Sequence, residues 1–191
     1  MSDTAGAIIA SMSSSGFAVF DTAVGPCGIA WDDRRVIGVQ LPEASLEKMH
    51  ARLSRRFPAL HEAAPPADIQ QVIERIIILL QGERIDLTDV LVDMERVPAF
   101  NRQVYEIARS IPPGSTLTYG DVAKRLGDPA IAREVGQALG QNPFPIIVPC
   151  HRVIAAGGKT GGFSGGDGVK TKLKLLMIEL AKTDDLPSLF D

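Results

Sequence analysis

The sequence lacks a long apolar run, a cysteine framework and an early basic segment. No apolar stretch approaches the ~18 to 20 residues that a membrane span needs, and the first basic residue is Arg34, too late for a signal or transit peptide. The two cysteines, Cys27 and Cys150, lie in dissimilar settings, which argues against a disulfide scaffold or a four-ligand zinc site. We therefore expect a protein of the reducing cytoplasm with no membrane partner.

The composition is that of an ordinary globular protein. Of 191 residues, 45% are hydrophobic and 23% are charged, which excludes disordered and collagen-like classes. The length allows one large domain or two small ones. The net charge is −3, but residues 101–174 hold ten Lys and Arg against five Asp and Glu, a local charge of +5, and the rest carries −8. This asymmetry is compatible with a polyanionic ligand, and an ordinary solvated surface explains it equally well.

The first half of the chain reads as strands followed by helices. Residues 1–16 are small and serine-rich, and we expect a mobile arm. Residues 16–43 alternate short β-rich runs with turns, which predicts an antiparallel meander. Residues 45–57 are expected to be helical. Apolar residues at helical spacing predict a second helix with one face on the sheet: Ile69, Val72, Ile73, Ile76, Ile77 and Leu80.

Beyond residues 86–97 the pattern changes to short helices separated by Gly and Pro. One helix is predicted over residues 100–110. Thr118 is expected to cap a second helix over residues 119–126, and Pro129 to begin a third that ends near Gly140. This spacing is typical of a helix-turn-helix, although ordinary helical hairpins share it.

Residues 142–154 carry the most informative chemistry. A short apolar strand between prolines is expected there, and it delivers Cys150, His151 and Arg152 in succession. Both neighbours can favour a thiolate at Cys150, whereas we expect Cys27 to be a small buried hydrophobe. In an extended strand Cys150 and His151 point to opposite faces, so contact between them requires a turn at Pro149 or a bridging water.

Two later features are candidates for parts of the same site. An activated nucleophile needs a third group that orients its base, and Glu179 is the acid of the apolar C-terminal helix; a solvated helix-end carboxylate is the alternative interpretation. Residues 157–166 contain six glycines but lack the spacing of a phosphate-binding loop. They either let a flat ligand approach the backbone closely or form a flexible surface loop.

The chain resembles the O6-alkylguanine-DNA alkyltransferases, also called methylated-DNA-protein-cysteine methyltransferases. The resemblance covers residues 97–180 strongly, and residues 21–25 more loosely. It rests on five blocks in the right order: residues 119–123, 132–136, 142–143, 149–153 and 162–166. It implies an α+β protein, with a ribonuclease-like α/β domain (antiparallel sheet plus helices) over residues 1–92. Residues 93–191 would form a mainly helical, winged-helix-like DNA-binding alkyltransferase domain with a helix-turn-helix.

The resemblance also implies a function in DNA repair. Cys150 would take the alkyl group from O6 of a guanine flipped out of double-stranded DNA, in an irreversible and stoichiometric transfer that consumes the protein. O4-alkylthymine is a second candidate substrate. By the same resemblance, His151 draws the thiol proton through a water toward Glu179, and Asn142 braces the turn that presents the cysteine.

Further residues would handle the base and the DNA. By resemblance, Tyr119 donates a proton to guanine N3 as the base leaves, which neutralises developing negative charge. Arg133 would occupy the gap in the base stack. Ala132 and Gly136 are small residues that would let their helix approach the minor groove.

The resemblance also implies which residues form the pocket, and the sequence departs from the family pattern in three places. The backbones of Cys150, Val153 and Ser164 would read the guanine edge. Phe163 stands where many members have Tyr, which keeps a ring wall but loses a hydroxyl. Glu134 places an acid beside Arg133, where small residues are usual, and about two extra residues precede Glu179.

Two other functions remain as alternatives. Alkyltransferase-like proteins bind damaged DNA without transfer and lack the acceptor cysteine, so Cys150 favours transfer. A Cys-His hydrolase would require an oxyanion hole that the sequence does not place. We expect a monomer with no cofactor. We also expect no metal site, because His50 and His61 have only Cys27 as a potential co-ligand.

Overall fold

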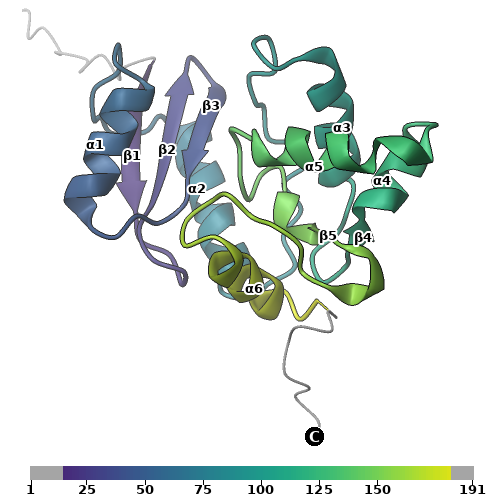
Figure 1. Cartoon of the computed structure of the whole chain (residues 1–191). Coiled ribbons are helices and arrows are strands. Elements are labelled where there is room, and N and C mark those ends of the chain that lie inside the picture. Colours follow the sequence, from purple (N-terminus) through teal and green to yellow (C-terminus); the bar gives the residue numbers. More distant parts are fainter. Residues whose placement is uncertain (1–14, 182–191) are drawn as a thin grey trace, which may run out of the picture.

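The computed structural model describes residues 15–181 and has a mixed α/β architecture (Figure 1). A small sheet with two helices forms the N-terminal half, and short helices form most of the C-terminal half. In the described residues, no helix is both long and apolar enough to cross a membrane.

The predicted meander is confirmed as a three-stranded antiparallel sheet in the order β1-β2-β3. Its strands are β1 (Ser15–Phe20), β2 (Cys27–Asp32) and β3 (Arg35–Gln40). The expected mobile arm is wrong for residues 15 and 16, because Gly16 pairs with Trp31 and packs so closely that a Cβ would lie 3.0 Å from the indole ring. Residues 1–14 of that arm lie outside the described residues.

The two predicted N-terminal helices are confirmed and cover opposite faces of the sheet (Figure 1). They are α1 (Leu46–Arg56) and α2 (Ala67–Leu80). Met49 and Leu53 of α1 pack with alternate strand residues such as Ala30, whereas α2 packs with the other set, including Trp31. The side chain of Ser45 caps α1.

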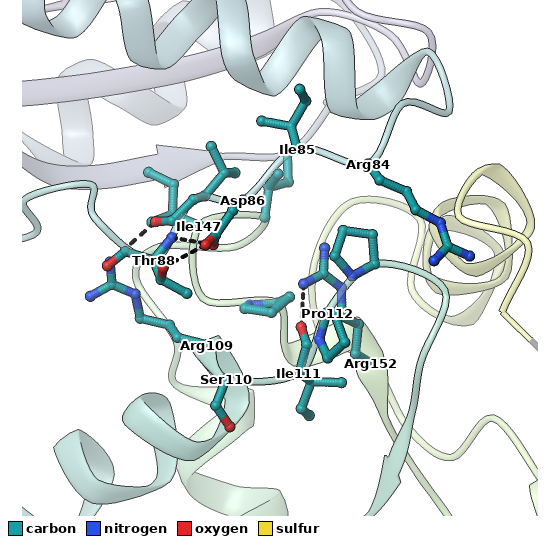
Figure 2. Close-up of a pocket in the computed structure, with 14 residues that line it drawn as sticks. Arg84, Ile85, Asp86, Thr88, Arg109, Ser110, Ile111, Pro112, Ile147 and Arg152 are labelled. Atoms are coloured by element: carbon teal, nitrogen blue, oxygen red, sulfur yellow. Dashed lines mark hydrogen bonds between the residues drawn. The ribbon is translucent and has the colours of Figure 1, made fainter.

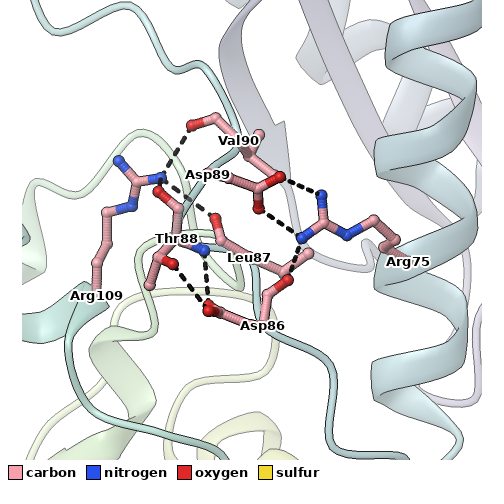
Figure 3. Close-up of polar contacts among 7 residues, drawn as sticks. All are labelled: Arg75, Asp86, Leu87, Thr88, Asp89, Val90 and Arg109. Atoms are coloured by element: carbon pink, nitrogen blue, oxygen red, sulfur yellow. Dashed lines mark hydrogen bonds and ion pairs between the residues drawn. The ribbon is translucent and has the colours of Figure 1, made fainter.

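The connection between the two halves is held from both sides by arginines (Figure 3). Arg75 of α2 binds the carboxylate of Asp89 through two nitrogens, at 2.6 and 3.1 Å, and also donates to the carbonyl of Asp86. From the other side, Nη2 of Arg109 donates to the carbonyls of residues 87, 88 and 90. The connection is therefore an ordered part of the fold.

The C-terminal half contains the predicted short helices, with one difference. The third predicted helix begins as a 3-10 turn, capped by the Asp128 side chain, before the α-helix starts. Thr118 and Asp121 form a capping box that fixes the start of the second. The elements are α3 (Ala99–Arg109), β4 (Leu117–Thr118), α4 (Tyr119–Arg125), η1 (Pro129–Ile131), α5 (Ala132–Gly140), η2 (Cys150–Arg152), β5 (Val153–Ile154), η3 (Ala156–Gly158) and α6 (Val169–Ile178).

One hydrophobic cluster runs through both halves. It joins Trp31 of the sheet and Ile76 of α2 to Val104 of α3, Val148 of the loop before η2 and Leu175 of α6. The short strands β4 and β5 pair in parallel beside it. The segment that carries Cys150 is therefore anchored in the central core of the molecule.

Candidate active site

Cys150 lies at the start of a turn and not in a strand. The expected strand is wrong, because Cys150 begins the 3-10 turn η2 and only Val153–Ile154 is extended. The side chain of Asn142 closes the preceding loop by donating to the carbonyl of Val148 at 2.8 Å and accepting from the Phe144 amide at 2.9 Å. These side-chain bonds compete with a strand ladder and wind the chain into a loop.

The backbone of this loop includes one strained position. Ile146 has φ of 77°, in the left-handed region that a β-branched residue rarely adopts. Such a position costs on the order of 1–3 kcal/mol and persists only where the surroundings enforce it. Ile146 is buried in the central core, which supplies that constraint.

Cys150 lies on a cavity of about 520 Å³ between α4, α5 and the glycine-rich loop. This volume falls within the range of about 300–1,000 Å³ that is usual for small-ligand sites. The part of the glycine-rich segment at residues 162–164 forms one wall of the cavity. Seven of the residues singled out in the sequence line this cavity: Tyr119, Ala132, Arg133, Gly136, Cys150, Phe163 and Ser164.

Val153 is placed differently from those residues. It is fully buried and is not among the cavity-lining residues, and its carbonyl accepts a hydrogen bond from Nζ of Lys172 at 2.6 Å. Arg133, in contrast, is exposed in the first turn of α5 at the edge of the cavity. The structure therefore places Arg133 within reach of a ligand that enters the cavity.

His151 and Glu179 form a buried pair behind Cys150. Nε2 of His151 lies 2.9 Å from Oε1 of Glu179, and both side chains are almost completely buried. A carboxylate only accepts hydrogen bonds, so Nε2 carries the proton and Nδ1 has the free lone pair. Nδ1 is buried and has no hydrogen-bond partner among the described residues. Burial lowers the pKa of His151, so the ring is a neutral base.

Arg152 is the second partner of Glu179. Its guanidinium binds both carboxylate oxygens, at 2.8 and 2.9 Å, and donates to the carbonyl of Ile111 on the wall of a second cavity of about 310 Å³ (Figure 2). Burial alone would raise the pKa of Glu179, but bonds and charge from His151 and Arg152 outweigh it and lower the pKa to about 2. The alternative interpretation of Glu179 as a solvated carboxylate is wrong.

Lys172 is a site residue that the sequence analysis missed. Its side chain is fully buried on α6 and lies over the rings of Tyr119 and Phe163, at 5.6 and 6.0 Å from their centroids. Burial lowers the pKa of Lys172 to about 8, so the ammonium group is largely charged at neutral pH. One signal was available, because Lys172, Leu175 and Glu179 share a helical face in an otherwise apolar stripe.

Opposing effects act on the thiol of Cys150. Burial raises its pKa most strongly, while a hydrogen bond from the Asn142 side chain and the charge of Lys172 lower it. Because the net direction is upward, the resting group is a thiol. Formation of the nucleophile therefore requires a base.

Tyr119 is a neutral donor on the cavity wall. Burial raises its pKa, and its hydroxyl lies 3.4 Å from the carbonyl of Gly162 and 3.5 Å from Nζ of Lys172. Gly161 makes room for the ring, since a Cβ there would lie 3.1 Å from it. A phenol in this position can protonate a leaving group.

The other cysteine, Cys27, and the histidines outside the site do not form a second catalytic or metal site among the described residues. Cys27 is buried, its pKa is raised by burial to about 12, and its sulfur lies 3.7 Å from the hydroxyl of Thr22. His50 pairs with Glu62 at 3.5 Å. Within residues 15–181, no three His, Cys, Asp or Glu side chains gather in a way that could hold a metal ion.

Comparisons with known proteins identify the family of this chain. The family profile "6-O-methylguanine DNA methyltransferase, DNA binding domain" matches residues 99–181. A methylated-DNA-protein-cysteine methyltransferase of Methanothermobacter thermautotrophicus is 35% identical over 152 residues, which is 80% of this chain and 78% of that protein. Its namesake in Mycobacterium tuberculosis is 31% identical over 175 residues, 92% of this chain and 98% of that protein.

Solved structures give the same assignment. The crystal structure of Mycobacterium tuberculosis OGT in complex with DNA has a TM-score of 0.69 at 32% identity and covers 86% of this chain and 92% of that one. The O6-methylguanine-DNA methyltransferase of Pyrococcus kodakaraensis has a TM-score of 0.65 at 32% identity, over 85% of this chain and 98% of that one. The chain belongs to the methylated-DNA-protein-cysteine methyltransferase family.

Proposed function

We propose that this protein repairs double-stranded DNA by moving the alkyl group of O6-alkylguanine onto the sulfur of Cys150. The observation that carries the proposal is the position of Cys150, which opens onto the cavity while its neighbour His151 is held in a buried pair with Glu179. The relatives are named for this reaction, and one related structure is a complex with DNA. The net charge of +5 over residues 101–174 suits a polyanionic partner.

The proton of the thiol has a defined acceptor in this proposal. The neutral Nδ1 of His151 takes it through a bridging water, and the resulting imidazolium is stabilised by the carboxylate of Glu179. The thiolate then attacks the alkyl carbon, so that a carbon–sulfur bond forms and the carbon–O6 bond breaks. The thioether is stable, so each protein molecule acts once.

The guanine leaves with developing negative charge, which a nearby donor can neutralise. Tyr119 is our candidate for protonating N3, because its hydroxyl is neutral and borders the cavity. Nζ of Lys172 lies 3.5 Å from this hydroxyl and places a positive charge beside it. The backbones of Cys150 and Ser164 belong to residues that line the cavity and are our candidates for reading the guanine edge, with Phe163 as the ring wall. Val153 is a weaker candidate, because it does not line the cavity and its carbonyl already accepts from Lys172.

The two halves have different tasks in this proposal. We infer that residues 93–191 form the winged-helix-like alkyltransferase domain, with α4, η1 and α5 as its helix-turn-helix, and that residues 1–92 form a ribonuclease-like supporting domain. Ala132 and Gly136 leave a small-sided face on α5 for the minor groove. Because a single chain supplies every proposed site residue, we infer that the protein acts as a monomer. A reduced thiol that acts on DNA is consistent with a location in the cytoplasm.

The reaction is tested by incubating the protein with a duplex that contains one O6-methylguanine. The intact mass should increase by one methyl group, the increase should map to the peptide with Cys150, and the reaction should stop at one equivalent. The same experiment with O4-methylthymine tests the second substrate. Label on another residue, or repeated turnover, would refute the proposal.

Arg133→Ala should separate base extrusion from chemistry. Arg133 is exposed at the edge of the cavity, where its side chain can replace an extruded base in the stack. Extrusion costs a few kcal/mol, so the rate with duplex DNA should fall on the order of 10²-fold while the rate with a free O6-alkylguanine base stays near that of the parent. Single-turnover rates with the two substrates measure this, and equal losses with both would contradict a stacking role.

Lys172→Met should make the Cys150 thiol harder to ionise. The charge of Lys172 lowers the pKa of Cys150, so its loss should raise that pKa further. Transfer at neutral pH should therefore slow about tenfold, and its pH profile should move to higher pH. The measurement is the single-turnover rate between pH 6 and 9. Lys174→Met, which removes an exposed charge from the same helix, is the control. An unchanged pH profile in Lys172→Met would exclude this role for Lys172.

A further inference from the structure

Arg56, the last residue of α1, connects the N-terminal half to the loop before Cys150. Its Nη1 donates to the carbonyl of Val39 in β3, and its Nη2 donates to the carbonyl of Pro143, both at 2.7 Å. The same Pro143 carbonyl also accepts from the Val39 amide at 2.9 Å. Strand β3 is the edge of the sheet that faces the C-terminal half (Figure 1). The bonds of Arg56 to Val39 and Pro143 therefore make it span this junction.

The arrangement of Arg56 is specific. Burial lowers the pKa of this guanidinium, and within the described residues no carboxylate forms an ion pair with it. The fold provides space for it at Gly38, where a Cβ would lie 2.9 Å from Nη2 of Arg56 and 2.4 Å from the ring of Phe57. A poorly solvated cation without a counter-ion is costly, so the contacts that remain must keep it in place. These are the two carbonyl bonds and the ring of Phe57, whose centroid lies 4.9 Å from Cζ of Arg56.

Pro143 is the residue next to Asn142, whose side chain closes the loop. Asn142 donates to the carbonyl of Val148, and the amide of Cys150 donates to that same carbonyl at 2.8 Å. Movement of the Pro143 carbonyl would therefore be transmitted through Asn142 and Val148 to the start of η2. An error of about 1 Å in the position of a reacting group can cost on the order of 10²-fold in rate.

We propose that Arg56 is a positioning residue for alkyl transfer, which fixes the corner at Asn142 and Pro143 and thereby sets the geometry of the Cys150 thiol. This role rests on the proposed function of Cys150. It gives the N-terminal half a part in the chemistry without contact to the reacting atoms. Both terminal nitrogens of Arg56 are engaged with carbonyls, so the role does not require that Arg56 bind DNA.

The test compares Arg56→Met and Arg56→Lys with Arg55→Met. Arg55 is the exposed neighbour on the same helix and controls for the loss of charge. Three quantities are measured on the full chain: the single-turnover transfer rate at saturating O6-methylguanine duplex, the affinity for an unmodified duplex, and the pH dependence of Cys150 alkylation by iodoacetamide. The last is read from the mass of the Cys150 peptide and needs no DNA.

We expect Arg56→Met to lower the transfer rate about tenfold at saturating DNA and to move the iodoacetamide pH profile, with affinity for DNA unchanged. Arg56→Lys should lie between it and the parent, because an ammonium reaches only one of the two carbonyls well. If Arg56→Met does not fold, Arg56→Lys alone decides, by the same two measurements against Arg55→Met.

Other outcomes would overturn the proposal. A variant with reduced thermal stability but the parent transfer rate and the parent pH profile would show a purely structural arginine. Reduced affinity for DNA with an unchanged saturated rate would show a DNA contact. If the parent itself transfers no methyl group, the proposed function fails, while the iodoacetamide profile still reports whether Arg56 positions the thiol.

Discussion

Cys150→Ser should abolish alkyl transfer while leaving the affinity for DNA near that of the parent. A serine hydroxyl ionises far less readily than a thiol and is a much weaker nucleophile, so the single-turnover rate should fall on the order of 10³-fold or more. The change replaces one atom on the cavity floor and leaves the exposed face of α5 as it is. The protein would then behave as a binder of damaged DNA.

The measurements are methyl transfer by intact mass and binding by fluorescence anisotropy with the same duplex. Cys27→Ala is the matched control, because Cys27 is buried in the core and its pKa is raised to about 12. It should transfer at the parent rate. Transfer by Cys150→Ser, or its loss in a folded Cys27→Ala protein, would move the acceptor away from Cys150.

Glu179→Gln should produce the largest loss of stability among single changes at the site. It removes the negative partner of the buried Arg152 and leaves that charge uncompensated, which typically costs about 3–5 kcal/mol. Each pKa unit corresponds to about 1.4 kcal/mol, so a pKa lowered from 4.5 to about 2 indicates a contribution of about 3 kcal/mol. Transfer should also slow, on the order of 10²-fold, because an amide stabilises an imidazolium less than a carboxylate does.

The pH dependence of this loss has a definite sign. The pKa of Glu179 is lower in the folded state than in the unfolded state, so its contribution is complete above about pH 4.5 and disappears as the pH falls toward 2. Urea unfolding at pH 7 and at pH 3 should therefore show a larger difference between parent and variant at pH 7. Glu106→Gln, at an exposed position on α3, should show no such difference. A difference in unfolding free energy between parent and Glu179→Gln that is larger at pH 3 than at pH 7 would contradict this assignment.

Much of the fold could be predicted from local signals. Ser45 and Thr118 are side-chain caps, and their helices begin where the sequence indicates. Five of the six apolar positions predicted for α2 are buried, and Ile77 is half-buried. These features depend on residues within a few positions of one another, which is why a single sequence reveals them.

The features that the sequence did not reveal depend on contacts between distant residues. Arg56 binds the carbonyl of Pro143, which lies 87 positions later in the chain. Glu179 is buried because Arg152 and His151, more than 25 positions away, bind its carboxylate. The helical face of Lys172 hinted at burial, but its position over the rings of Tyr119 and Phe163 depends on residues far from it or on another element. No local pattern encodes these distances.

The cluster that joins Trp31 to Leu175 has a consequence for dissection of the molecule. Severing the chain near residue 93 would expose apolar side chains of both fragments to water at the surface where they now meet. Heat should therefore melt the whole protein in one cooperative transition, and an excised catalytic fragment should be prone to aggregation. A mutation in the core beneath the sheet can therefore lower the fraction of protein that is folded and able to accept an alkyl group, although it lies far from the DNA.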